Sequence, residues 1–246
     1  MKHPGPGTYS WRARFGYVAL APMEIAPLEL AKMAPDGVVP IATNLHLREF
    51  TAAEWADAAS ELPDSVRGLD RFGPDLIALD AAPLLYLDEG GSGDPLSASL
   101  AGSTSRPIVF DIRAAVDALR SLNAQRIAIA SPHAALVDRI ARSFARDGFS
   151  VVNVASMPHA SVRDLRRRPL GLAYQVAMEA ARGGRRADAL FIDSADWAVA
   201  PHIDRLEREL GIPVVGLCQA VVWAVLSRLG IAERTPGYGA LLAAAA

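Results

Sequence analysis

Asp75-Leu-Ile-Ala-Leu-Asp80-Ala-Ala82 and Asp188-Ala-Leu-Phe-Ile-Asp193-Ser-Ala195 are two distant stretches of the same kind. Each is a short apolar strand that ends in Asp and is followed by small residues. Two similar βα lobes facing each other would bring both strand ends into one cleft, and ligands of open α/β sheets bind at the carboxyl ends of strands. The alternative is a chance likeness between two hydrophobic strands.

Short apolar runs and amphipathic segments alternate along the rest of the chain. The runs lack clean alternation of polar and apolar residues, which is typical of strands covered on both faces. They predict eight strands, at 15–20, 38–43, 76–81, 107–111, 126–131, 149–154, 189–193 and 213–217. Strands that alternate with helices indicate parallel sheets and an α/β fold.

Helix boundaries are marked by local signals. Thr51-Ala-Ala-Glu54 predicts a capping box. Segment 133–146 has Leu136, Ile140 and Phe144 on one face, and glycines end the segments 202–210 and 219–229. Two further expectations are a loose tail over 1–14 and a surface loop or lid over 90–95.

Composition excludes several classes of protein. The 246 residues suffice for one large domain or two lobes, and 51% are hydrophobic, so the chain is not disordered. A net charge of -2 gives no general attraction to nucleic acid or to a membrane. The single cysteine, Cys218, fits a reducing, cytoplasmic setting, and the sequence lacks dinucleotide, P-loop and zinc-protease motifs.

A set of motifs in the C-terminal third points to a known family. They are Ala189-Leu-Phe-Ile-Asp193-Ser194, Ile203-Asp-Arg-Leu-Glu-Arg-Glu-Leu-Gly-Ile-Pro-Val-Val215, Gln219-Ala220 with Trp223, and Arg234-Thr-Pro-Gly-Tyr-Gly239. Together they resemble the aspartate/glutamate racemase superfamily, in the branch that holds arylmalonate decarboxylase and maleate cis-trans isomerase.

The resemblance implies two pseudo-symmetric α/β lobes, each a parallel-sheet sandwich, with the site in the cleft between them. The first lobe would comprise 15–112 plus 213–240, and the second 113–212. It also implies a cofactor-independent enzyme, an isomerase or a decarboxylase, that acts on a small carboxylic acid or a related metabolite.

The resemblance places reactive cysteines at the ends of the two similar strands. Here the first position falls at Asp80 or Ala81 and the second at Ser194, and His133 stands opposite a hydrogen-bonding tyrosine. A serine hydroxyl has a pKa far above that of a thiol and needs a base to react. We therefore expect altered, non-cysteine chemistry; a catalytically inactive relative that binds a small ligand or a pathway partner is the alternative.

The candidate site residues follow from these positions. The catalytic candidates are Ser194, His133, Asp80 and Asp196, and the substrate-binding candidates are Asn44, Ala81, Ala82, Tyr86 and Ala195. The alternatives without a functional role are helix capping by the aspartates, a serine that merely replaces a cysteine, and a solvent-facing histidine. We expect Cys218 to be a structural residue, and we expect the Arg163 to Arg168 run to be a solvated helix end.

No metal site and no cofactor are expected. The expected ligand is a small carboxylate, with neither nucleic acid nor a membrane as partner, and a homo-oligomer is possible.

Overall fold

Two four-stranded parallel sheets form the framework of the computed structural model, which describes residues 9–88, 94–157, 164 and 169–244. The first sheet has the strand order β2-β1-β3-β4 and the second β6-β5-β7-β8. The first contains β1 (Ala13–Ala19), β2 (Val38–Asn44), β3 (Leu76–Leu79) and β4 (Ile108–Phe110). The second contains β5 (Arg126–Ser131), β6 (Ser150–Ser156), β7 (Ala189–Ile192) and β8 (Val214–Gly216). All eight predicted strands are present, so the α/β fold with two such lobes is confirmed.

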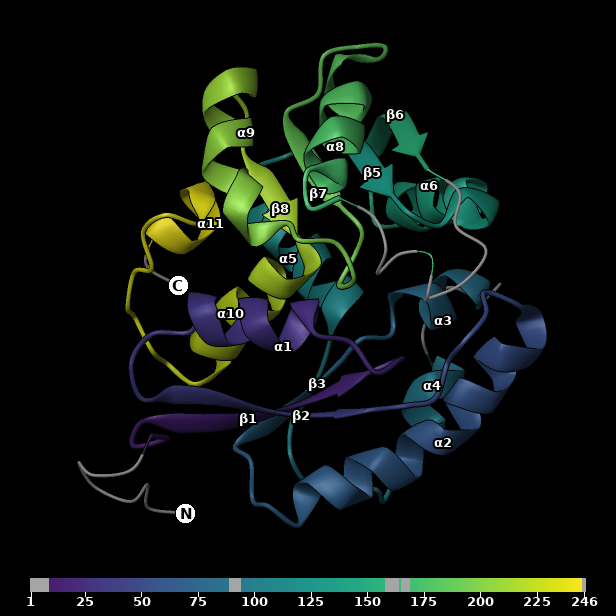
Figure 1. Cartoon of the computed structure of the whole chain (residues 1–246), viewed down its shortest axis with the longest axis vertical. Coiled ribbons are helices and arrows are strands. Elements are labelled where there is room, and N and C mark those ends of the chain that lie inside the picture. The colour runs from purple at the N-terminus through teal and green to yellow at the C-terminus, as the bar shows by residue number, and fades with distance from the viewer. Residues whose placement is uncertain (1–8, 89–93, 158–163, 165–168, 245–246) are drawn as a thin grey trace.

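Helices connect the strands and cover the sheets (Figure 1). The longer ones are α1 (Ile25–Met33), α2 (Ala52–Asp70), α5 (Asp111–Ser121), α6 (Val137–Arg146), α8 (Leu172–Arg182), α9 (Ile203–Leu210) and α10 (Leu217–Arg228). The short ones are α3 (Ala82–Leu87), α4 (Asp94–Ser99), α11 (Gly239–Ala243) and the 3₁₀ turns η1 (Ala134–Leu136) and η2 (Ala200–His202). None of the described helices is long and apolar enough to cross a membrane.

The two similar stretches occupy equivalent places in the two sheets. β3 lies between β1 and β4, and β7 lies between β5 and β8. At the start of each strand an aspartate accepts a backbone N–H from the neighbouring strand, Asp75 from Arg14 at 2.8 Å and Asp188 from Arg126 at 2.9 Å. The likeness in sequence therefore reflects the same local structure built twice.

The two lobes share one hydrophobic core through helices α5 and α10. Each of these helices follows the last strand of its sheet, and the two pack against each other (Figure 1). Both also contact β4 and β8, so apolar side chains of both sheets join one cluster, including Phe15 and Ile77 with Phe191 and Val215. This shared core fixes the two lobes against each other.

The expected boundary at residue 213 differs from the structure. It assigns β8 to the first lobe, whereas β8 pairs with β7 in the second sheet and Leu190 lies opposite Val214. Val214 and Val215 are fully buried there, which favours a strand in the second sheet. The helix that follows β8, α10, reaches the first lobe, where it packs on α1.

The helix signals are partly confirmed. The backbone N–H of Glu54 donates to the Thr51 hydroxyl at 3.3 Å, but the Glu54 carboxylate bonds Arg48 instead of completing the capping box. Segment 133–146 begins as the turn η1 before α6, and Gly211 ends α9 in the left-handed region at φ 67°. Positions 1–8, most of the predicted 90–95 loop, and most of the Arg163 to Arg168 run lie outside the described residues.

Candidate active site

A small cavity lies where the carboxyl ends of β3 and β7 meet. Its volume is about 20 Å³, which is room for a single water molecule. Residues after both strands line it, as the sequence predicts for a shared cleft. The lining comprises Leu20, Ala21, Leu47, Phe50, Trp55, Asp80, Ala82, Pro83, His133, Asp193, Ser194, Ala195, Asp196 and Leu217.

Asp80 is the titratable residue that lines the cavity at the end of β3. It follows Leu79, its backbone N–H donates to the carbonyl of Val18 at 2.9 Å, and its carboxyl accepts the Leu20 N–H over 3.4 Å. Burial, and then the neighbouring Asp111 and Asp196, raise the pKa of Asp80 well above its ordinary value. The side chain therefore favours its neutral, proton-carrying form.

Asp193 is the counterpart of Asp80 on the β7 side, and its partners are different. Tyr86 Oη donates to Asp193 Oδ1 at 3.0 Å, and Ser131 Oγ donates to Oδ2 at 2.9 Å. Burial raises the pKa of Asp193 to about 6, although both hydroxyls oppose the rise. Ser131 Oγ also accepts the backbone N–H of His133 at 3.1 Å, so the same network holds the histidine backbone in place.

Ser194 stands at the start of a tight turn. Its Oγ accepts the backbone N–H groups of Asp196 and Trp197, each at 3.0 Å. The side chain is buried and lines the cavity, where its O–H can still donate to a ligand. Ser194 therefore caps the turn and also faces the cavity.

Three rings cover the cavity beside these polar groups. Phe50 and Trp55 stack at 5.7 Å between centroids, and the ring of His133 meets Phe50 edge-on at 5.3 Å and Trp55 at 6.3 Å. Phe50 precedes α2 and Trp55 lies in its first turn, whereas His133 follows β5. Trp55 also lines a neighbouring groove of about 600 Å³ between α2, α3 and α4.

The structure brings together most of the predicted site residues. Asp80, Ala82, His133, Ser194, Ala195 and Asp196 all line the cavity. Three others lie outside its described lining: Asn44 donates to the Leu45 carbonyl, Ala81 donates to Asp111, and Tyr86 is buried against Asp193. Tyr86 thus contacts the site through Asp193, because the α3 segment directs its ring into the interior.

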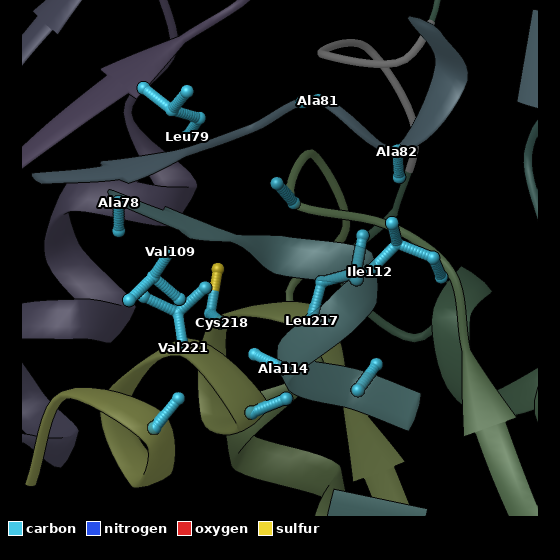
Figure 2. Close-up of a cluster of buried hydrophobic side chains, with 14 of the residues drawn as sticks. Ala78, Leu79, Ala81, Ala82, Val109, Ile112, Ala114, Leu217, Cys218 and Val221 are labelled. Atoms are coloured by element: carbon cyan, nitrogen blue, oxygen red, sulfur yellow. The ribbon is translucent and has the colours of Figure 1, made fainter. Parts of the chain in front are cut away.

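Cys218 lies apart from this cavity. It lies in the first turn of α10 among apolar side chains such as Ala78, Val109 and Val221 (Figure 2). Burial, and then Glu29 and the site carboxyls, raise the pKa of its thiol well above the ordinary value. A thiol held protonated in the core is a poor nucleophile, and the structural role of Cys218 stays a prediction.

Asp111 is a buried carboxyl next to the site that sequence reasoning missed. It begins α5 directly after β4, is almost fully buried, and its charge raises the pKa of Asp80, which follows the neighbouring strand. The signal was present, because Asp111 ends a predicted strand as Asp80 and Asp193 do. Only the sheet order, which places β4 beside β3, shows that its carboxyl reaches Asp80.

The described residues contain no group of three His, Cys, Asp or Glu side chains arranged to hold a metal ion.

Comparisons with known proteins agree in fold and in sequence. The chain is 24% identical to the arylmalonate decarboxylase of Bordetella bronchiseptica over 220 residues, covering 88% of this chain and 91% of that protein. It is 28% identical to a maleate isomerase of Nocardia farcinica over 226 residues, covering 87% and 81%. A solved structure of a Nocardia farcinica maleate cis-trans isomerase mutant, in which serine replaces a cysteine and a succinylcysteine intermediate is covalently bound, superimposes with a TM-score of 0.81 at 21% identity, covering 94% of this chain and 98% of that one.

A family model described as arylmalonate decarboxylase matches residues 19–242, which include seven of the eight strands, the last residue of β1, and every residue that lines the cavity. The chain therefore belongs to the arylmalonate decarboxylase family.

Proposed function

We propose that this chain is a cofactor-independent enzyme that acts on a small carboxylic acid, within the decarboxylase and isomerase lineage of its family, through side chains other than cysteine. The observation that carries the proposal is the composition of the cavity. Titratable and hydroxyl groups from both lobes, Asp80, His133, Ser194 and Asp196, face one small cavity. This is the type of arrangement that general acid–base catalysis requires.

The absence of a thiol from this space supports the altered chemistry. The family relative with the bound succinylcysteine uses a cysteine covalently, whereas the single cysteine of this chain is buried in the core and does not line the cavity. In our proposal Asp80 and Ser194 stand at the two positions where such cysteines would react. Proton transfer to a carbon next to a carboxylate then falls to Asp80 or His133.

Decarboxylation fits these groups without further help. When CO₂ leaves a malonate-type substrate, the carbon–carbon bond breaks and its electron pair stays on the α carbon, where the remaining carboxylate delocalises it. A proton from Asp80 or His133 forms the new C–H bond, and the donor keeps the electron pair of its own bond to hydrogen. Ser194 O–H can donate to the remaining carboxylate, and the stacked rings of Phe50 and Trp55 exclude water.

One observation favours the alternative, a relative that binds a ligand without turnover. The cavity of about 20 Å³ is too small for a dicarboxylate, so a ligand has to displace the ring cover or the β7 turn. A protein that never opens in this way has no access for a substrate.

The single thiol also supports a cytoplasmic location as part of the proposal.

A thermal-shift screen followed by turnover assays tests the proposal. Malonate, phenylmalonate, maleate, aspartate and glutamate are the probes, since a ligand at ~100 times its Kd adds ~2.7 kcal/mol to the free energy of unfolding. We expect at least one probe to stabilise the protein and to be consumed. The matched control is His46→Ala, because His46 is exposed and pairs with Glu61 away from the cavity. Stabilisation without consumption of any probe would favour the binding protein.

A further inference from the structure

Asp111 has a buried carboxyl oxygen that its surroundings leave unsatisfied. Its Oδ1 accepts the backbone N–H groups of Ala81 at 3.1 Å and Ile112 at 2.7 Å. Within the described part of the chain, no N–H or O–H group donates to Oδ2, and the residue is only 1% exposed. A buried carboxylate oxygen without a donor is costly, so this oxygen requires a proton or a proton-carrying neighbour.

The neighbour of Asp111 is Asp80. Leu79 pairs with Phe110 across β3 and β4, so Asp80 and Asp111 follow at the same level of the sheet, and Asp111 accepts the backbone N–H of Ala81. Neighbouring carboxyl groups can hydrogen-bond to each other only if one of them carries a proton. The other titratable groups whose charge acts on Asp80 or on Asp111 are Asp193 and Asp196. Each is an acid, so these groups do not compensate a second negative charge on the pair.

The groups that face the pair from the other packed elements are acids as well. Tyr17 on β1 and Cys218 on α10 are both buried, and the charges of Asp80 and Asp111 act on both of them. Glu29 on α1 acts on Cys218 and accepts the Ala200 N–H at 2.8 Å. Burial among acids favours the form of the pair with the smaller negative charge.

We propose that Asp80 and Asp111 share a single proton and that Asp80 presents it to the cavity, where it donates a hydrogen bond to a carboxylate of the ligand. Asp80 lines the cavity and is the candidate that touches the substrate, whereas Asp111 acts through it as a positioning residue. The arrangement explains how an aspartate can stand in a site for carboxylates, because a neutral acid attracts the ligand that an anion would repel. This inference rests on the proposed function for its ligand class, but the shared proton is a property of the protein alone.

The proton makes ligand binding depend on pH in a defined direction. A bound carboxylate raises the pKa of the pair further, because a second negative charge disfavours ionisation. Binding therefore takes up a proton wherever the free pair is partly ionised, and affinity falls as the pH rises through that range. A pair that is already fully ionised at neutral pH would show the opposite behaviour, namely weak binding without proton uptake.

Infrared difference spectroscopy of the free protein tests the shared proton without any ligand. At about pH 8, Glu29 and Asp193, with pKa values of about 7 and about 6, are mostly ionised, so a remaining neutral carboxyl band reports the pair. We expect the band in the parent and its loss in both Asp80→Asn and Asp111→Asn, whereas Glu29→Gln and Asp193→Asn keep it. A parent without the band, or a band that survives both substitutions in the pair, would overturn the proposal.

Calorimetry with maleate and phenylmalonate, each titrated in two buffers of different ionisation enthalpy, tests the role of the proton in binding. We expect proton uptake in the parent, and in Asp111→Asn an affinity at about pH 8 that is ~10-fold lower with little uptake, because an amide donor stabilises Asp80 as an anion. Unchanged affinity and uptake in this variant would remove Asp111 from the mechanism. A parent that has the infrared band but binds no carboxylate would refute the proposed ligand, while the shared proton would stand.

Discussion

The ends of β3 and β7 have the same backbone structure, but the aspartates that follow them have different hydrogen-bond partners. In both, a fully buried four-residue strand leads into an aspartate whose N–H bonds to the neighbouring strand, Asp80 to Val18 and Asp193 to Ala130. Asp193 then receives two hydroxyl donors, whereas Asp80 receives one long backbone contact and a second carboxyl. The same local fold thus gives one aspartate a stable hydrogen-bond network and leaves the other as an acid.

This difference shows that the position in the fold does not by itself assign the chemistry. Hydroxyl donors favour the ionised form of a carboxyl, and a neighbouring carboxyl favours the neutral form. A pair of titratable groups with opposed environments is the usual signature of separate acid and base roles. We therefore expect substitutions at Asp193 to affect stability and substitutions around Asp80 to affect ligand binding and chemistry.

The largest expected effect concerns Ser194, which follows β7, and His133, which follows β5, as the proposed reacting groups. Ser194→Ala and His133→Ala should each lower kcat by ~10²–10⁴-fold on a substrate found by the screen, because each removes a proton-carrying group from the cavity. Steady-state kinetics measures the effect, with His46→Ala as the control. If both variants retain the turnover of the parent, the reacting groups lie elsewhere.

Ser194→Ala should also cost ~1 kcal/mol in the free energy of unfolding, because the substitution removes the hydroxyl that caps the turn.

The next effect separates the two aspartates by stability. Asp193→Ala leaves the hydroxyls of Tyr86 and Ser131 buried without their acceptor, which should cost ~2–5 kcal/mol in the free energy of unfolding. Urea unfolding measures it. Asp80→Asn should cost much less, since the amide is uncharged and can still donate a hydrogen bond to the Asp111 carboxylate. Equal losses of stability in both variants would contradict the different roles of Asp193 and Asp80. Tyr86→Phe removes one of the two donors to Asp193 and should cost ~1 kcal/mol in the free energy of unfolding.

Stability should also depend on pH through the buried carboxyls. The folded protein holds Asp193 at a pKa of about 6 and Asp111 and Glu29 at about 7, against ordinary values of 3.8 for aspartate and 4.5 for glutamate. Their contribution is present in full below about pH 4 and is lost as the pH rises through about 6 to 7. For Asp193 it is on the order of 3 kcal/mol.

Urea unfolding at several pH values between about 4 and 8 measures this decline, and Asp193→Asn should make it shallower. Asp188 serves as the control. It is paired with Arg126 at the surface and its pKa is lowered to about 2, so its contribution changes only below about pH 4. A stability that rises over the tested range would show that these carboxyls ionise without cost when buried.

The smallest expected effect concerns the Cys218 thiol, which is not part of the site at the ends of β3 and β7. Cys218→Ala should leave turnover unchanged and cost about 1 kcal/mol of stability, because the side chain is small and packed in the core. A thiol reagent should label Cys218 only after unfolding. Rapid labelling of the folded protein, or turnover abolished by the substitution, would return the thiol to the mechanism.

Much of the fold could be predicted from the sequence because the signals for strands and helix ends are local. Buried strands between glycine-ended helices predicted all eight strands, and the repeated Asp-ended motif predicted the shared cleft. The boundary at residue 213 was wrong because strand partners are chosen by long-range pairing, so β8 joined β7 although its following helix crosses to the other lobe. The sequence also placed Tyr86 in the site but did not show that its hydroxyl would be directed at Asp193.

The sequence by itself determined which residues end the strands, and hence that aspartates, a serine and a histidine would meet at one edge. Only the tertiary structure decided the environment of each. Sheet order places β4 beside β3 and so brings Asp111 to Asp80, and the network of Tyr86 and Ser131 forms around Asp193. The pKa of a carboxyl depends on burial and on neighbours far away in the chain, so its role can be assigned only after the chain has folded.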